Sequence, residues 1–361
     1  MLCLPLGPPS GRSDRRAGLG TLPIMTDPRT AASARHPLTV SGSVELAVLE
    51  RSGWDESRHV GVGVVVDRDG RELRRVGDAD ATIYPRSCLK PLQALTVLRS
   101  GVSLDGPQAV LATASHAGTP AHLEVVEALL ARSGSTEDDL LCPPAWPGDH
   151  VSARHATSAR RLAMNCSGKH AAFLLACAEN GWDPRTYVDS AHPLQVAVRE
   201  TVSEYTGETV DHAGVDGCGA PVVATTVTGL ARAVGRITGA VSASGPRDEH
   251  AAHLVDAVLA DAWAIDGPGR ANTVTIDELG VLAKLGAEGV MVMGTTDGVA
   301  VAVKVLDGNV RAGTLVALRL LVDEGAVDDA AADRVVERTL EKVTGGDGLV
   351  GRIRLGAGLE R

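Results

Sequence analysis

Ser87 and Lys90 lie three positions apart in residues 84–93, YPRSCLKPLQ. Residues at i and i+3 share a helix face, so the lysine amine can reach the serine hydroxyl and make it nucleophilic. Pro85 ahead of an apolar run predicts a helix over residues 87–99, with Ser87 in the first turn, where unpaired backbone N–H groups favour developing negative charge. The pattern indicates acyl transfer, although a capping serine followed by a solvated lysine gives the same spacing.

Two further segments carry groups suited to proton transfer. Ser115 follows an apolar stretch that predicts a strand ending in a small-residue loop. It is a second candidate nucleophile or proton relay with His116 or His122 as its base, and a helix-capping loop is the structural alternative. Lys284 lies in an apolar stretch just before an expected core strand. Burial there would make it lose its proton readily, as a general base requires, whereas snorkelling to the surface would keep it charged.

Two cysteines lie beside polar groups. Cys166 opens an apolar helix, a position that lowers a thiol pKa and suits a nucleophile or a metal thiolate. Cys218 lies in the loop 216–219, between two glycines. Such a loop contributes little to core packing, so its polar groups are expected to have a chemical role. The two thiols could bind a soft or borderline cation, with Asp216, His170 or Lys169 completing a tetrahedron, although the spacing matches no standard zinc finger. Six cysteines in a chain of this size fit reduced thiols or metal ligands better than a disulfide framework.

Composition limits the class of function. The 361 residues are 44% hydrophobic but include only one Phe, three Tyr and four Trp, so the core must consist of Ala, Val and Leu. Scarce aromatic residues argue against base stacking, and a net charge of −10 argues against binding a phosphate backbone. We therefore expect no nucleic-acid partner.

The N-terminal stretch differs from the rest of the chain. Residues 1–36 are rich in Arg with scattered Pro and Gly, which predicts a disordered extension before a single catalytic domain over residues 37–361. Met25 is as good an initiator as Met1, so an over-extended gene start explains the stretch better than a transit peptide. No segment has the ~20 apolar residues of a membrane span, and the first residues are too short for a secretory h-region. We expect a cytoplasmic protein that contacts no membrane.

Strands are expected at both ends of the chain and helices in the middle. Residues 44–50, 59–67 and 72–76 predict an antiparallel meander, and residues 289–294 and 298–306 a hairpin around Asp297-Gly298. Helices are predicted over residues 87–99, 121–133, 167–180, 193–206, 225–237, 248–264, 314–323 and 329–343. Residues 61–70 and 298–308 have similar patterns, so one sheet containing both is the economical arrangement. The predicted fold is α/β (α+β), with an antiparallel sheet from N- and C-terminal strands flanked by helices.

Five motifs in order resemble the asparaginase II family, the rhizobial-type or class 3 L-asparaginases. They are PRSCLKP (85–91), ASHAG (114–118), NCSGKH (165–170), DGCG (216–219) and AKLGAEG (283–289). The resemblance covers roughly residues 43–356. It implies a fold similar to the serine β-lactamase and glutaminase superfamily, a homodimer, and L-asparagine as the substrate.

The resemblance also implies roles for individual residues. It pairs Ser87 with Lys90 and Ser115 with Lys284, and it assigns a zinc ion to Cys166, Lys169 and Cys218. A lysine binds zinc only as a neutral amine, and a nearby thiolate-bound cation would lower its pKa enough. The residues expected to surround the metal or to hold the substrate's α-amino and α-carboxylate groups are Arg86, Asn165, His170 and Asp216.

The expected reaction is hydrolysis of the side-chain amide of L-asparagine. A neutral lysine takes the serine proton, the alkoxide attacks the amide carbon, ammonia leaves, and water cleaves the β-aspartyl ester to give L-aspartate. Ser87 ranks above Ser115 as the nucleophile because helix geometry fixes its lysine. Zinc is expected to organise the pocket rather than to activate water.

Two other classes of protein stay open. A glutaminase or β-lactamase-like serine hydrolase would share the Ser-x-x-Lys helix, although the Lys-Thr-Gly strand motif of the penicillin-recognising enzymes is missing. A non-catalytic zinc-binding or thiol redox sensor would use Cys166 and Cys218 without the serines.

Overall fold

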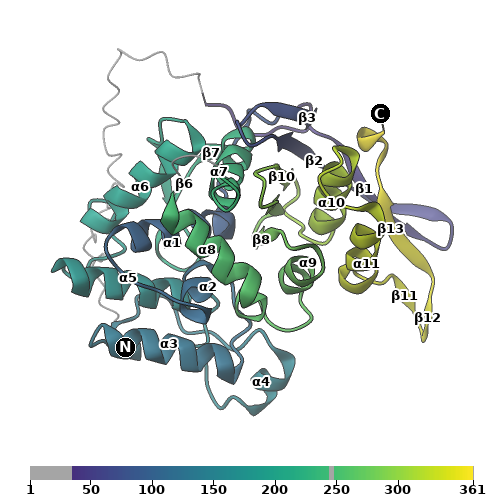
Figure 1. Cartoon of the computed structure of the whole chain (residues 1–361). Helices are drawn as coiled ribbons and strands as arrows, with labels where there is room; N and C mark the ends of the chain where they lie inside the picture. Colours follow the sequence, from purple (N-terminus) through teal and green to yellow (C-terminus); the bar gives the residue numbers. More distant parts are fainter. Residues whose placement is uncertain (1–34, 244–247, 361) are drawn as a thin grey trace, which may run out of the picture. The chain divides into compact units, whose positions relative to one another are not determined.

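Strands from both ends of the chain form one seven-stranded antiparallel sheet in the computed structural model, which describes residues 35–243 and 248–360 (Figure 1). The first half of β2 pairs with β1 and the second half with β3, while β10 lines the opposite edge of β2. In spatial order the strands are β13 (Gly351–Leu355), β1 (Val44–Arg51), β2 (Trp54–Val66), β10 (Ala300–Val305), β9 (Val290–Gly294) and β8 (Leu282–Gly286), with β3 (Glu72–Val76) paired to β2.

The pairing of β2 with β10 joins the two segments of similar sequence pattern. Their register runs from Gly61 opposite Val305 to Val66 opposite Ala300. Gly61 permits this approach, because a Cβ there would lie 2.1 Å from the Lys304 carbonyl oxygen. The predicted meander, the β9–β10 hairpin and the single sheet that contains both are therefore confirmed.

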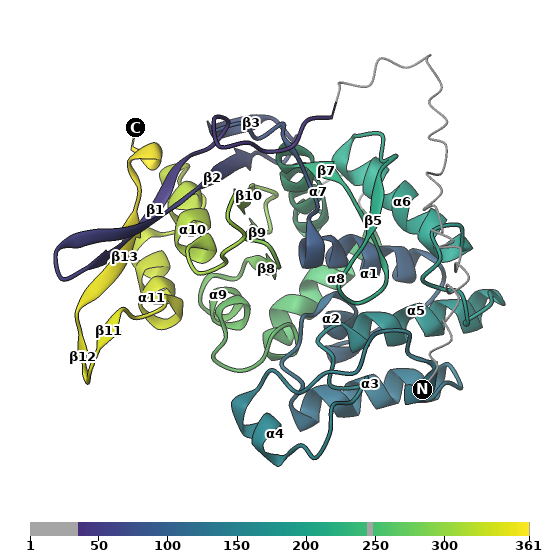
Figure 2. The ribbon, with the colours of Figure 1, turned by 180° about the vertical axis from the view of Figure 1, so that it is seen from behind.

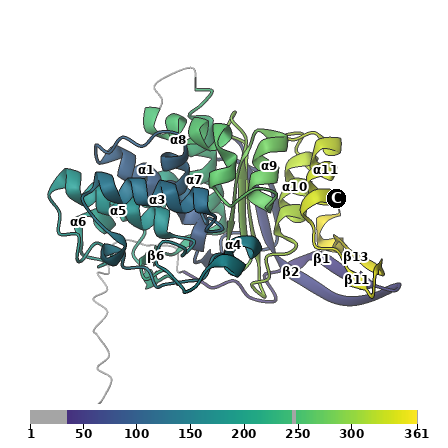
Figure 3. The same ribbon diagram turned by 90° about the horizontal axis from the view of Figure 1, so that it is seen from below.

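Helices cover both faces of the sheet (Figure 3). α10 (Gly313–Asp323) packs on one face, and α11 (Asp329–Thr339) packs behind it. α7 (Val227–Gly239) packs on the other face and joins the sheet to the helical region. The other helices are α1 (Lys90–Arg99), α2 (Pro107–Thr113), α3 (Pro120–Arg132), α4 (His150–His155), α5 (Ser167–Asn180), α6 (Pro193–Thr206), α8 (Glu249–Ala260) and α9 (Ala271–Leu279).

Most helices lie where the sequence predicted them, and α5 and α6 match to the residue. The strand expected before Ser115 was wrong, because residues 107–113 form helix α2. A seven-residue apolar segment has no periodicity that separates a strand from a buried helix. The sequence also gave no indication of α4, α9 or β13, and Lys284 lies within a strand, β8, rather than before one.

The chain from Arg35 onward forms one compact unit, and the predicted disorder of residues 1–36 falls almost entirely outside the described residues. The β1–β2 turn and a small hairpin of β11 (Thr344–Gly345) and β12 (Gly348–Leu349) lie at the end of the sheet away from the helical region (Figure 2). Short two-stranded pairs join β4 (Thr82–Ile83) to β7 (Thr225–Thr226) and β5 (Ala213–Val215) to β6 (Pro221–Val223). In the described part of the chain, no helix is long and apolar enough to cross a membrane.

Candidate active site

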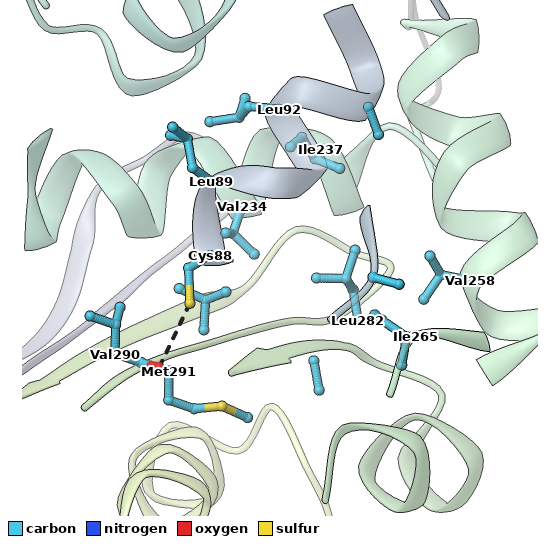
Figure 4. Close-up of a cluster of buried hydrophobic side chains, with 14 of the residues drawn as sticks. Cys88, Leu89, Leu92, Val234, Ile237, Val258, Ile265, Leu282, Val290 and Met291 are labelled. Carbon is cyan, nitrogen blue, oxygen red and sulfur yellow. Dashed lines mark hydrogen bonds between the residues drawn. The ribbon is translucent and has the colours of Figure 1, made fainter. Parts of the chain in front are cut away.

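Ser87 lies on a 3₁₀ turn, Arg86–Leu89, that leads directly into α1. The next residue anchors this turn to the sheet: Cys88 Sγ lies 3.1 Å from the Lys284 carbonyl oxygen. It also lies 3.7 Å from the Val290 carbonyl oxygen, a contact shown in Figure 4. Burial raises the pKa of Cys88 to about 12, so it stays a neutral thiol. Ser87 is half-buried, and its side chain makes no hydrogen bond with any described residue.

The backbone just before Ser87 is strained. Arg86 has φ +53°, in the left-handed region that non-glycine residues seldom occupy. Its guanidinium Nε donates to Asp216 Oδ1 at 2.7 Å. A terminal nitrogen of the same guanidinium, Nη1, lies 3.7 Å from Glu288 Oε1. Strain of this kind persists where surrounding contacts compensate for it and is frequent at functional sites.

Gly286 in β8 allows the Ser87 turn to pack closely against the sheet. A Cβ at this position would lie 2.8 Å from the Pro85 carbonyl oxygen and 3.0 Å from Cys88 Sγ. Gly286→Ala should therefore displace the turn, destabilise the fold by about 1–3 kcal/mol and lower enzymatic activity. Thermal unfolding and activity assays measure both effects. Gly148→Ala is the control, because a Cβ there meets nothing closer than 3.7 Å, and equal behaviour of the two variants would contradict this account.

Ser115 Oγ lies between two buried lysine amines. Lys90 Nζ is 3.0 Å from it and donates to the Ala114 carbonyl oxygen at 2.6 Å. Lys284 Nζ is 2.9 Å from the same hydroxyl. The Ser115–Lys284 contact is the one the resemblance implied, whereas Lys90 is bonded to Ser115 and not to Ser87. The reason is burial: an enclosed ammonium must find acceptors, and residues 114 and 115 supply them inside the protein, whereas Ser87 is only half-buried.

Lys284 has the properties of a proton acceptor. Its side chain is fully buried, and burial together with the charge of Lys90 lowers the pKa of Lys284 to about 8. About a tenth of the amine is then neutral at pH 7, far more than for an ordinary lysine. Asn272 holds its strand in place, since Asn272 Oδ1 accepts the Leu285 N–H at 2.9 Å.

Lysine itself is rare in this chain. The sequence contains five lysines, and three of them, Lys90, Lys169 and Lys284, are fully buried around this site. Arginine cannot be deprotonated in a protein, whereas a buried lysine can. The scarcity of lysine was the sequence signal that could have drawn attention to these three residues together.

The histidines beside Ser115 hold the loop and do not act on its hydroxyl. His116 Nδ1 accepts the Gly118 N–H at 3.1 Å, and its Nε2 lies 2.9 Å from Ser167 Oγ. Burial lowers the pKa of His116 well below its usual value, so it is neutral. His122 stacks on His116 with ring centroids 5.2 Å apart and contacts Thr119 through Nδ1. Neither ring is hydrogen-bonded to Ser115, whose hydroxyl instead contacts the amines of Lys90 and Lys284.

A second cluster joins Cys166, Lys169 and Cys218. Lys169 Nζ lies 3.1 Å from Cys218 Sγ, and the side chain of Cys166 interacts electrostatically with that of Cys218. The interaction with Cys218, together with the charges of Lys90 and Lys169, holds the pKa of Cys166 well below its ordinary value. Burial disfavours the charge on Lys169, but the adjacent sulfurs more than offset it and raise the pKa of Lys169. Lys90 thus touches both clusters, one through Ser115 and the other through Cys166.

Of the four predicted substrate-binding residues, Asn165 contacts the thiol cluster, His170 is buried beside Lys169 in the sequence, and Asp216 pairs with Arg86 next to Ser87. Asn165 Oδ1 lies 3.2 Å from Cys166 Sγ. His170 is fully buried, and burial lowers its pKa to about 4. Asp216 is ion-paired with Arg86; burial favours its protonated form, but the Arg86 hydrogen bond and the Gly217 N–H outweigh burial and lower the pKa of Asp216. The binding roles of all four residues stay predictions.

No group of three or more His, Cys, Asp and Glu side chains is arranged to hold a metal among residues 35–243 and 248–360. The predicted zinc ligands include only two residues of those types, because the third donor is the amine of Lys169. Sequence patterns did not single out Cys88, Tyr187 or Asn272: Cys88 lies in the PRSCLKP motif but was passed over beside Ser87, and Tyr187 and Asn272 lie in no chemically distinctive motif.

Serine hydroxyls beside buried lysine amines are the groups that acyl-transfer hydrolases use. The sequence matches the family model L-asparaginase II over residues 47–355, and the chain belongs to that family. It is therefore a hydrolase that acts on amides of small molecules. No curated protein sequence matches the chain.

Solved structures give looser matches. Mglu is 15% identical, with 74% of this chain and 67% of that chain covered and a TM-score of 0.41. A β-lactamase from Mycobacterium bovis is 19% identical, with 78% and 95% covered and a TM-score of 0.39. A probable glutaminase from Bacillus subtilis, complexed with 6-diazo-5-oxo-L-norleucine, is 13% identical, with 73% and 83% covered and a TM-score of 0.34. Because these TM-scores are low, the family assignment rests on the sequence match.

Proposed function

We propose that the protein is an L-asparaginase that hydrolyses the side-chain amide of L-asparagine to L-aspartate and ammonia by serine–lysine catalysis. The observation that supports this most directly is the convergence of two buried lysine amines on Ser115 Oγ. The same lysines adjoin the Ser87 turn, one in sequence and the other through Cys88.

In the proposed reaction Ser87 attacks the substrate, and Ser115 relays protons between the two lysines. Ser87 is half-buried, so a substrate can reach it, and it lies at the start of α1, where free N–H groups favour an oxyanion. Lys90 accepts the Ser87 proton after it passes one of its own through Ser115 to neutral Lys284, and its bond to Ser87 forms when substrate binds, as catalytic hydrogen bonds often do. Ser115 then delivers a proton to the departing ammonia. Water hydrolyses the resulting ester by the reverse proton path.

The Arg86–Asp216 pair next to Ser87 suits an amino acid substrate. The guanidinium can bind an α-carboxylate and the carboxylate an α-ammonium. Asp216 keeps its negative charge at neutral pH because its pKa is lowered. A substrate bound between the two groups would replace the Arg86–Asp216 ion pair with two ion pairs, one between Arg86 and the α-carboxylate and one between Asp216 and the α-ammonium.

Ammonia release by the purified protein tests the proposal. L-Asparagine should be hydrolysed faster than L-glutamine. Faster release from L-glutamine would make the protein a glutaminase, and hydrolysis of a chromogenic β-lactam without amidase activity would make it a β-lactamase-like hydrolase. A protein inactive on all three that still responds to thiol oxidation would be a sensor. Light scattering tests the expected homodimer.

We further propose that zinc binds to Cys166, Lys169 and Cys218. The donors fit the ion, because the Lys169 amine contacts the Cys218 thiol, the Cys166 thiol interacts with both, and together the three would provide three of the four positions of a tetrahedron. Zinc would draw charge from the two thiolates, organise the pocket and help to bind substrate, since two thiolate ligands leave it a weak Lewis acid.

Elemental analysis of protein purified without chelator tests this site. We expect about one zinc per chain in the wild type and almost none in the Cys166→Ala, Cys218→Ala double variant. Cys177→Ala is the control, because this buried cysteine lies on α5 outside the cluster and should leave the zinc content unchanged. Equal zinc in the wild type and the double variant would refute the site.

A further inference from the structure

The two ring nitrogens of His170 face different partners. Nδ1 lies 2.7 Å from the Tyr187 hydroxyl. Nε2 is buried and has no conventional hydrogen-bond partner among the described residues. The ring also interacts with the side chain of Cys218. Because Nδ1 is occupied by Tyr187, the nitrogen that faces the sulfur is Nε2.

The hydrogen bonds of the Tyr187 hydroxyl determine which ring nitrogen of His170 carries the proton. The Tyr187 hydroxyl accepts the Leu141 N–H at 2.8 Å, and His170 Nδ1 is the only other group among the described residues within hydrogen-bond distance of it, so the hydroxyl proton has no other acceptor there. Nδ1 therefore accepts, and the ring proton of a neutral imidazole lies on Nε2. The opposite tautomer would leave a buried hydroxyl proton unpaired, which is unfavourable.

We infer that Tyr187 and His170 are positioning residues for the thiol cluster: the chain from Leu141 N–H through Tyr187 and His170 directs the Nε2–H at Cys218 Sγ and holds that sulfur as an acceptor. The inference rests on the proposed zinc-binding cluster and deepens it. Lys169 Nζ lies 3.1 Å from the same sulfur. If the amine of Lys169 turns to a metal ion, the His170 N–H still restrains the Cys218 thiolate. Such hydrogen bonds behind metal ligands fix their orientation and tune their basicity.

The surroundings make this arrangement rigid. Tyr187 is fully buried, and the Gln195 side-chain amide donates to its backbone carbonyl at 2.8 Å. The only phenylalanine of the sequence, Phe173, packs beside both rings, with centroids 6.2 Å from His170 and 6.2 Å from Tyr187. Lys169 Nζ lies 5.4 Å from the centroid of the same ring. In a chain with so few aromatic residues, their collection here restricts the imidazole to one orientation.

Zinc affinity, measured by competition with a chromophoric chelator at one fixed pH, is the first test. Tyr187→Phe should weaken zinc binding about 10–100-fold, because the hydroxyl that sets the tautomer is lost. His170→Gln, which keeps an N–H donor, should bind zinc more tightly than His170→Leu. Tyr205→Phe is the matched control: Tyr205 is also buried and donates to Asp248 at 2.7 Å, so its loss removes a hydroxyl bond outside the cluster and should leave zinc affinity unchanged. Equal affinity in Tyr187→Phe and the wild type would overturn the inference.

The second test needs no metal. Two-bond ¹H–¹⁵N spectra of metal-free protein report the tautomer of each histidine, and His170→Gln identifies the His170 signals. We expect the Nε2–H tautomer in the wild type and its loss or mixture with the Nδ1–H form in Tyr187→Phe. An Nδ1–H tautomer in the wild type would overturn the inference even if zinc binds. If the wild type binds no zinc but Tyr187→Phe still changes the tautomer as expected, the zinc proposal is refuted and the hydrogen-bond chain is supported.

Discussion

Ser87→Ala is expected to lower asparagine hydrolysis about 10⁴-fold or more while leaving the protein folded. Ser87 is half-buried and makes no side-chain hydrogen bond with a described residue, so its removal leaves no buried group unpaired. Because a nucleophile and its base act as one unit, Ser87→Ala combined with Lys90→Ala should be hardly slower than either variant alone. Steady-state kinetics and circular dichroism measure the two properties. Ser100→Ala, at the other end of α1, should retain normal activity.

A covalent probe decides between the two serines. A diazo ketone analogue of asparagine should label the peptide that contains Ser87, as shown by mass spectrometry, and Ser115→Ala should slow turnover about 10²–10⁴-fold without abolishing labelling. Labelling at Ser115, or near-normal turnover in Ser87→Ala, would exchange the roles of the two hydroxyls. Additive losses in the double variant would reject the Ser87–Lys90 unit.

The pH dependence of kcat/KM should report the ionisation of Lys284. Lys284 must be neutral to accept a proton, and its pKa is lowered to about 8. Below pH 8 the amine is mostly protonated, so kcat/KM should rise with pH and level off above about 8. Lys284→Met should remove this rise and lower the rate about 10²–10⁴-fold.

Two variants separate catalysis from charge. Lys284→Arg keeps a permanent positive charge and should be as inactive as Lys284→Met, because a guanidinium cannot accept the proton. Lys304→Met is the matched control, since Lys304 lies in the same sheet, is partly buried and bonds only to the Glu288 and Val305 carbonyl oxygens in the described structure. If Lys284→Met kept the rise near pH 8, another group would be responsible for it.

Much of the architecture was predictable from local patterns. Alternating valines in residues 61–66 and 300–305 predicted two strands of one sheet, because a period of two with a buried face has few other solutions. The N-terminus of α5 followed from the small polar residues before its apolar run, and it correctly placed Cys166 at a helix start.

The connections between the candidate groups were less accessible. Local spacing predicts a contact between Lys90 and Ser87, but in the folded chain the buried amine of Lys90 contacts Ser115 instead. Sequence spacing cannot predict this choice of partner, because it depends on tertiary contacts. Tyr187 lies in an irregular segment between α5 and α6, so no periodicity marks it, although it contacts His170. In the sequence Cys88 is only a neighbour of Ser87, but in the structure its thiol contacts the Lys284 carbonyl oxygen and so connects the turn to β8.

The sheet that carries Lys284 also constrains when this protein can fold. β1 pairs with β13, with Leu49 opposite Ile353, and β2 pairs with β10. At a ribosomal rate of about 5–20 residues per second, the roughly 300 residues between β1 and β13 take about 15–60 s to synthesise. Through that interval β1 lacks its partner β13, and for most of it β2 lacks its partner β10; contacts of such high sequence separation form slowly even afterwards. The topology therefore makes the nascent chain dependent on protection from aggregation until its last strand emerges.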